Sequence, residues 1–126
     1  AFLSVNKTDR VGLIPIAKSL MDLGFSLVAT KGTCKFLNEH GIICNDMFKV
    51  GEGRPNVVDE ILNDNIQLVI NTPEGPQSRF DEEAIGKTSV MKNILTITTL
   101  SGARAAIDSM KHLNEISVKA LQEYFK

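Results

Sequence analysis

The sequence contains little cysteine, no tryptophan and no long hydrophobic run, and neither sign of charge predominates. Two cysteines are too few for a disulfide scaffold and are typical of a reducing compartment, which predicts a cytoplasmic protein. No apolar stretch approaches the ~20 residues that cross a bilayer, and no signal-peptide pattern opens the chain, so no membrane contact is expected. Lys and Arg number 14 against 15 Asp and Glu, for a net charge of −1. A broadly basic nucleic-acid-binding protein is therefore excluded.

The rest of the composition is typical of one globular domain. The chain has 126 residues, of which 43% are hydrophobic and 23% are charged. It contains no repeat, low-complexity segment or internal linker, so residues 1–126 are predicted to form a single domain. Because the chain begins Ala1-Phe2-Leu3, without Met and inside a strand-like run, we expect it to be part of a longer polypeptide.

Strand-like and helix-like segments alternate along the whole chain. Apolar residues recur at helical spacing up to Leu23, in a helix that should begin near Val11 or Gly12 and hold Pro15 in its first turn. Alternation predicts βαβ units, and hence an α/β fold with a parallel sheet covered on both faces. The expected strands are 2–5, 25–30, 42–44 with 47–50, 67–71 and 94–98, and the expected helices are 11–23, 33–40, 56–63, 81–93 and 100–112. Residues 115–126 are expected to pack back onto the body.

Polar and cationic residues follow the predicted strands, at the edge of a parallel sheet where ligands bind. The sharpest element is Thr30–Thr33, where a strand ends, a glycine lets the backbone approach a ligand, and a helix begins. Free helix N–H groups and two hydroxyls make a phosphate cradle. The alternative is that one threonine only caps the helix. Lys49 either supplies a counter-charge or is a solvated lysine at a strand end.

The remaining motifs are weak. The segment Gly51–Asn56 begins like a dinucleotide fingerprint, but it lacks the third glycine and follows the third strand instead of the first. Cys34, His40 and Cys44 match no common zinc spacing. No Ser/His/Asp constellation is visible. We therefore predict neither a metal site nor a catalytic residue in this chain.

Several segments taken together resemble a known family. These segments are Ser4–Arg10, Gly24–Thr33, Gly41-Ile42, Lys49–Asn56, Ile70–Thr72, Thr98–Ala103 and the closing Leu121–Tyr124. Thr-x-Gly-Thr, Lys-Val-x-Glu-Gly-Arg-Pro and Asn-Thr in this order resemble the methylglyoxal-synthase-like regulatory domain of the carbamoyl phosphate synthetase large subunit. The resemblance covers nearly the whole chain.

The resemblance implies a fold and a site. The fold is a three-layer α/β/α arrangement with a five-stranded parallel sheet in the order 3-2-1-4-5. The implied site binds an allosteric nucleotide, UMP or IMP, and contains no catalytic residue. The residues expected to bind the effector and its phosphate are Ser4, Arg10, Thr30, Lys31, Gly32, Thr33, Lys49, Asn71 and Thr72.

The resemblance also implies partners. Ornithine binds such domains at the border with a neighbouring domain. The synthetase domains of the same chain use ATP with Mg or Mn, and a glutaminase small subunit completes the enzyme, which serves pyrimidine and arginine biosynthesis. No cofactor is expected in this domain itself.

Two positions depart from the family pattern, and three different functions compete with this interpretation. Arg10 stands where a lysine is common, and Pro73 stands where a second threonine often lies. The main competing function is a methylglyoxal synthase acting on dihydroxyacetone phosphate, but that chemistry needs a carboxylate base where this chain has Asn56. The remaining two are an inosinate cyclohydrolase, which shares the fold, and a stand-alone nucleotide sensor.

Overall fold

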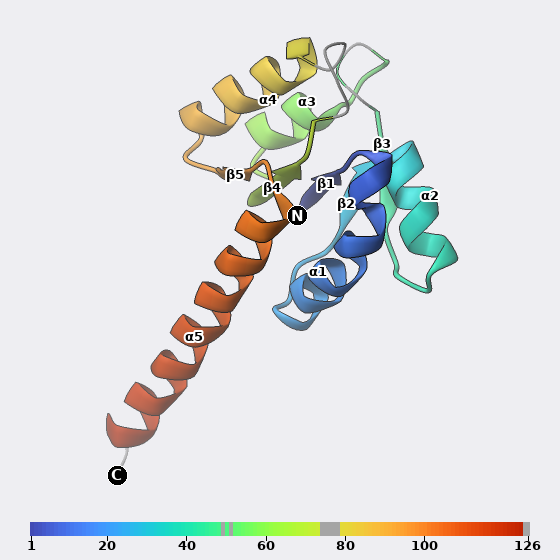
Figure 1. The fold of residues 1–126 in the computed structure, drawn as a ribbon. Coiled ribbons are helices and arrows are strands. Elements are labelled where there is room, and N and C mark those ends of the chain that lie inside the picture. The colour runs from blue at the N-terminus through green and yellow to red at the C-terminus, as the bar shows by residue number, and fades with distance from the viewer. Residues whose placement is uncertain (49, 51, 74–78, 125–126) are drawn as a thin grey trace.

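The computed structural model describes residues 1–48, 50, 52–73 and 79–124, which form alternating strands and helices (Figure 1). The strands are β1 (Phe2–Ser4), β2 (Val28–Thr30), β3 (Asn45–Met47), β4 (Leu68–Asn71) and β5 (Leu95–Ile97). The helices are the 3₁₀ turn η1 (Lys7–Asp9), α1 (Arg10–Asp22), α2 (Lys31–Glu39), α3 (Val57–Leu62), α4 (Arg79–Met91) and α5 (Leu100–Tyr124).

The strands form one parallel sheet in the order β3-β2-β1-β4-β5, as predicted. The strand order reverses between β1 and β4, where Ser4 pairs in register with Asn71. On the other side of β1, strand β2 ends at Thr30, which is paired with Met47 of β3. The carboxyl ends of β1, β2 and β4 therefore meet at one edge of the sheet, which is where a ligand is expected.

Helices cover both faces of the sheet, because successive strand residues point to opposite sides. Leu3, Ala29 and Ile70 pack with α1, α2 and α5 on one face. Phe2 and Val69 pack with α3 and α4 on the other face. Figure 1 shows the same division, with α3 and α4 together on one side of the strands and α1 on the other. The predicted three-layer α/β/α class is confirmed.

The start of α1 differs from the prediction. The side chain of Asn6 accepts a hydrogen bond from the Asp9 N–H at 2.9 Å and so caps the 3₁₀ turn η1. This turn leads directly into α1 at Arg10, and Pro15 consequently lies in the second turn of the helix. The expectation that Pro15 lies in the first turn is wrong, because the Asn6 cap starts helical structure several residues earlier.

Strand β3 and the end of the chain also differ from the prediction. Among the described strands β3 pairs with β2 alone, and as an edge strand its exposed residues Asn45 and Asp46 carry no hydrophobic signal. The predicted third segment, 42–44 with 47–50, therefore lies on either side of β3 and shares only Met47 with it. At the other end, α5 continues as one helix to Tyr124 and extends away from the sheet (Figure 1). The expectation that residues 115–126 pack back is wrong for residues 115–124, which continue α5, and the sequence after Gly102 contains no glycine or proline that would end this helix. Residues 125–126 lie outside the described part of the chain.

Candidate functional site

Three of the predicted site residues lie side by side at the carboxyl edge of the sheet. Ser4 ends β1, Thr30 ends β2 and Asn71 ends β4. The register of β1 with β4 places Ser4 opposite Asn71, and the Thr72 N–H donates to the Ser4 carbonyl at 2.9 Å. Residues that are far apart in the sequence are thus brought to one place by strand pairing alone.

The N-terminus of α2 lies at this edge. Thr30 is its N-cap residue and has extended backbone angles, but its side chain makes no capping hydrogen bond. The first N–H groups of a helix have no partner within the helix, and they carry the positive end of its dipole. The first turn, formed by Lys31, Gly32 and Thr33, contains no acidic residue that would neutralise that end. This arrangement favours an anion.

Two buried hydroxyls stand at the base of this turn. Thr30 and Thr33 are 5% and 1% exposed, and the Thr30 hydroxyl donates to the Thr33 Oγ1 at 3.4 Å. The Val5 N–H also donates to the Thr33 Oγ1, at 3.3 Å. Thr33 accepts both hydrogen bonds, so the proton of its own hydroxyl is left to donate to a ligand.

Arg10 extends from the start of α1 to the first turn of α2. A Cβ atom added at Gly32 would lie 2.6 Å from the Arg10 Nη2, which means that the guanidinium occupies the space that the absent side chain leaves. The Arg10 Nε is buried and has no hydrogen-bond acceptor among the residues that the structure describes. A cation placed against the positive end of a helix is electrostatically unfavourable. The arrangement becomes favourable when an anion lies between the two.

Asn6 organises this edge, although it is outside the predicted set. Its N–H donates to the Thr72 Oγ1 at 2.9 Å, and its side-chain amide donates to the Pro73 carbonyl at 2.9 Å. These hydrogen bonds join the segment after β1 to the segment after β4. Thr72 is 3% exposed, so its hydroxyl lies in the wall of the site. The sequence signal for Asn6 was its place just after the first strand, at the edge of a parallel sheet where ligands bind.

Of the two lysines predicted to bind the effector, the structure describes Lys31. Lys31 is exposed at the start of α2, and its Nζ lies 5.2 Å from the centroid of the Phe48 ring. Lys49 lies outside the described residues.

Asn56 has a structural role at the position where a methylglyoxal synthase is expected to carry its base. Its side chain accepts hydrogen bonds from the N–H groups of Val58 and Asp59, which caps α3. The Asp59 carboxylate in turn accepts hydrogen bonds from the Asn56 N–H and from Arg54. The hydrogen bonds from Arg54 hold the pKa of Asp59 below its usual value. The Asp59 carboxylate, in the first turn of α3, therefore stabilises a helix end and is not free to act as a base.

The histidines and cysteines lie elsewhere. His40 is at the C-terminal end of α2, the opposite end from Thr30, and its Nδ1 is 2.8 Å from the Phe36 carbonyl. The buried Cys34 thiol donates to the Cys44 carbonyl at 3.1 Å, and burial raises the pKa of the Cys44 thiol to about 12. Within the described ranges, no three His, Cys, Asp or Glu side chains are grouped in a way that could hold a metal ion.

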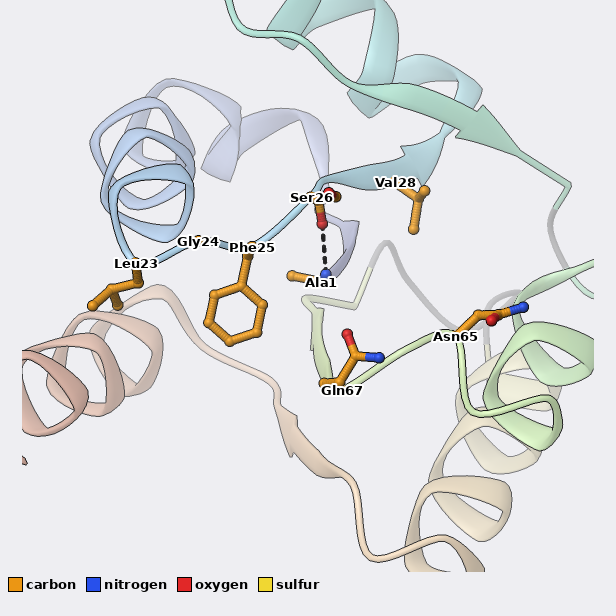
Figure 2. Close-up of a pocket in the computed structure, with 8 residues that line it drawn as sticks. All are labelled: Ala1, Leu23, Gly24, Phe25, Ser26, Val28, Asn65 and Gln67. Atoms are coloured by element: carbon orange, nitrogen blue, oxygen red, sulfur yellow. Dashed lines mark hydrogen bonds between the residues drawn. The ribbon is translucent and has the colours of Figure 1, made fainter. Parts of the chain in front are cut away.

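A cavity of about 410 Å³ lies at the other edge of the sheet (Figure 2). Ala1, Ser26 and Gln67 line it, and the Ala1 backbone nitrogen donates to the Ser26 carbonyl at 2.7 Å. None of the predicted site residues that the structure describes lines this cavity. A ligand bound there would therefore contact a different set of residues from one bound at the carboxyl edge.

A parallel α/β sheet with a candidate anion site at its carboxyl edge defines a class of protein, and comparison with known families identifies that class. The family model described as MGS-like domain matches residues 12–98, and the chain therefore belongs to that family. The crystal structure of methylglyoxal synthase from Elizabethkingia anophelis matches 84% of this chain and 75% of that one, with a TM-score of 0.64 and 16% identity. This likeness shows the fold alone.

The chain is also similar to curated carbamoyl phosphate synthases. The carbamoyl phosphate synthase large chain of Acidobacterium capsulatum is 48% identical over 123 residues, which are 96% of this chain and 11% of that protein. The C-terminal section of the large chain from Methanopyrus kandleri is 42% identical over 129 residues, covering 100% of this chain and 24% of that protein. The predicted resemblance is confirmed, and the chain spans only a small part of these relatives. In the described part of the chain, no helix has the length and apolar character to cross a membrane.

Proposed function

We propose that this chain is the regulatory domain of a carbamoyl phosphate synthetase large chain, and that it binds a nucleoside monophosphate, UMP or IMP. The phosphate lies at the N-terminus of α2, between the guanidinium of Arg10 and the hydroxyls of Thr30 and Thr33. Lys31, Gly32, Lys49, Ser4, Asn71 and Thr72 complete the proposed site. The domain itself carries out no chemistry and modulates ATP-dependent synthesis elsewhere in the enzyme.

One observation carries the proposal: Arg10 lies against the positive end of α2, with its Nε buried and without an acceptor in the described part of the chain. Burying an unsatisfied charged donor destabilises a fold, and a phosphate removes this cost by accepting hydrogen bonds from it. The same phosphate can accept from the Thr33 hydroxyl, whose proton is left to donate. Helix N–H groups, hydroxyls and a guanidinium together match a doubly charged phosphate monoester.

The relatives support the rest of the proposal. They are carbamoyl phosphate synthase large chains, and one of them is a C-terminal section. The longer enzyme is accordingly proposed to be cytoplasmic and to use ATP with Mg or Mn in its synthetase domains. Those domains and a glutaminase small subunit are the proposed protein partners, with ornithine as a second effector at the domain border. A methylglyoxal synthase is disfavoured because the Asn56 and Asp59 side chains are both used in the cap of α3.

Calorimetry with the 126-residue chain tests this function. UMP or IMP should bind, and uridine, which lacks the phosphate, should bind at least about tenfold more weakly, since hydrogen bonds to charged groups contribute about 1.5–3 kcal/mol. An assay with dihydroxyacetone phosphate should yield no methylglyoxal. Methylglyoxal formation without nucleotide binding would replace this proposal by the enzymatic function.

Gly32→Ala should weaken nucleotide binding without weakening the fold. The added Cβ would meet only the flexible end of the Arg10 side chain, which can move away at little cost. Alanine also favours helix over glycine by roughly 0.8–1 kcal/mol in a helix interior. We expect UMP affinity to fall about three- to tenfold, because the guanidinium is displaced from the phosphate.

Gly86→Ala in α4 is the matched control, since an added Cβ there meets nothing within 4 Å. It should raise thermal stability and leave UMP affinity unchanged. Equal affinities for the Gly32→Ala variant and the unaltered chain would show that Arg10 does not contact the ligand.

A further inference from the structure

Phe48 presents an aromatic ring beside the first turn of α2. The residue follows the edge strand β3, and its side chain is 36% exposed. The Lys31 ammonium lies over this ring, 5.2 Å from its centroid. A lysine ammonium within about 6 Å of a ring centroid is attracted by the negative face of the ring.

The ring is held in place by the loop that follows β3. The Phe48 backbone forms a parallel bridge with Asn56, and the Asn56 side chain is fixed as the cap of α3. A Cβ added at Gly53 would lie only 3.1–3.2 Å from three carbons of the ring, so this glycine leaves the space that the ring occupies. The position of the ring is consequently set by the backbone of residues 52–56 and the start of α3.

Lys31 needs such a support. It is the first residue of α2, where the helix dipole repels a cation. A free lysine side chain has many rotamers, and selecting one of them costs entropy when an anion binds. The Phe48 ring offsets the repulsion and restricts the ammonium to the neighbourhood of the α2 N-terminus.

We infer that Phe48 is a positioning residue that holds the Lys31 ammonium ready for the phosphate at the N-terminus of α2. Phe48 itself does not contact the phosphate. The inference rests on the proposed function, because it assigns Lys31 to the same phosphate site. It adds that the loop of residues 52–56 acts on the affinity of that site through one aromatic ring.

A double-mutant cycle with UMP tests the inference. Lys31→Met should weaken UMP binding about fivefold, and Phe48→Leu should weaken it about two- to threefold. In the Lys31→Met background, Phe48→Leu should have no further effect, because the ring acts only through the lysine. Phe48→Tyr retains the ring and should restore the affinity of the unaltered chain.

Phe36→Leu is the matched control, since the Phe36 ring contacts the His40 ring towards the far end of α2, with ring centroids 4.3 Å apart. It should leave UMP affinity unchanged. The inference is wrong if the Phe48→Leu variant binds UMP as tightly as the unaltered chain. It is also wrong if Phe48→Leu weakens binding equally with and without Lys31. Either result leaves the proposed function intact. If the unaltered chain binds no nucleotide, it is the proposed function that fails.

An NMR measurement tests the contact between Phe48 and Lys31 even if the chain binds no nucleotide. The ring should shift the Lys31 Hε resonances upfield. Phe48→Leu should abolish this shift, while the backbone amide spectrum still shows a folded protein. Unchanged Hε shifts in the Phe48→Leu variant would show that the contact does not exist in solution, whatever the chain binds.

Discussion

Replacing Arg10 by methionine is expected to lower the affinity of the chain for UMP at least about tenfold while leaving the fold as stable as before. The guanidinium supplies charge-assisted hydrogen bonds, each of which contributes about 1.5–3 kcal/mol. Methionine keeps an apolar stem of similar length and removes the buried Nε that has no acceptor. The free energy of unfolding without ligand should therefore stay the same or rise.

A fall in UMP affinity without a fall in the free energy of unfolding would show that Arg10 has a binding role and not a structural one. Calorimetry with UMP and thermal unfolding without ligand are the two measurements. Arg104→Met, which removes an exposed guanidinium from α5, is the control and should change neither. The UMP affinity of Arg10→Lys should lie between those of Arg10→Met and Arg104→Met, since lysine keeps the charge and loses the planar guanidinium. An Arg10→Met variant that binds UMP normally would contradict the phosphate site.

Replacing Thr33 by valine should reduce both binding and stability. The change removes the hydroxyl that is left to donate to the phosphate, for which we expect a loss of about tenfold or more in UMP affinity. It also removes the acceptor of the Val5 N–H in a site where Thr33 is 1% exposed. An unsatisfied buried N–H costs about 1–3 kcal/mol, which denaturant unfolding can resolve.

Thr33→Ser is the control for this variant. It keeps the hydroxyl and loses one methyl group, so it should retain most of the affinity for UMP. If Thr33→Ser loses as much affinity as Thr33→Val, the methyl group and not the hydroxyl matters, and Thr33 would be a packing residue.

The parallel α/β class was predictable because local pattern and topology agree in this chain, whereas the order of the strands was implied by the resemblance to the family. Alternating strand and helix patterns require parallel βαβ units, and right-handed crossovers leave few strand orders. Strand β4, with three buried residues in succession, gave the clearest signal. A third strand was also predicted, but its bounds were misplaced, because an edge strand with exposed Asn45 and Asp46 has no apolar pattern.

The proposed phosphate cradle was predictable only in its local part. Thr30–Thr33 lies at a strand-to-helix junction, as its sequence indicates, and the residue types alone could not decide between a cap and a ligand site. The structure gives a more specific arrangement, since Thr30 occupies the N-cap position but donates to the Thr33 hydroxyl. Its side chain is therefore not used in capping.

The long-range contacts could not be read from spacing. Nothing in the sequence says that Arg10 fills the space above Gly32, or that Gly53 makes room for the Phe48 ring. The length of α5 is a different case, because continuous helix-forming residues after Gly102 permit either a single helix or a return onto the body. Pairwise packing decides such questions, and local propensity does not.

A titration of the isotopically labelled chain with UMP, followed by amide NMR, tests the central claim most directly. The phosphate is proposed to bind the free N–H groups at the start of α2. The largest shifts should therefore appear at Lys31, Gly32 and Thr33, and they should be small with uridine. Shifts confined to Ala1, Ser26 and Gln67, around the cavity at the opposite edge, or no shifts at all, would contradict the account.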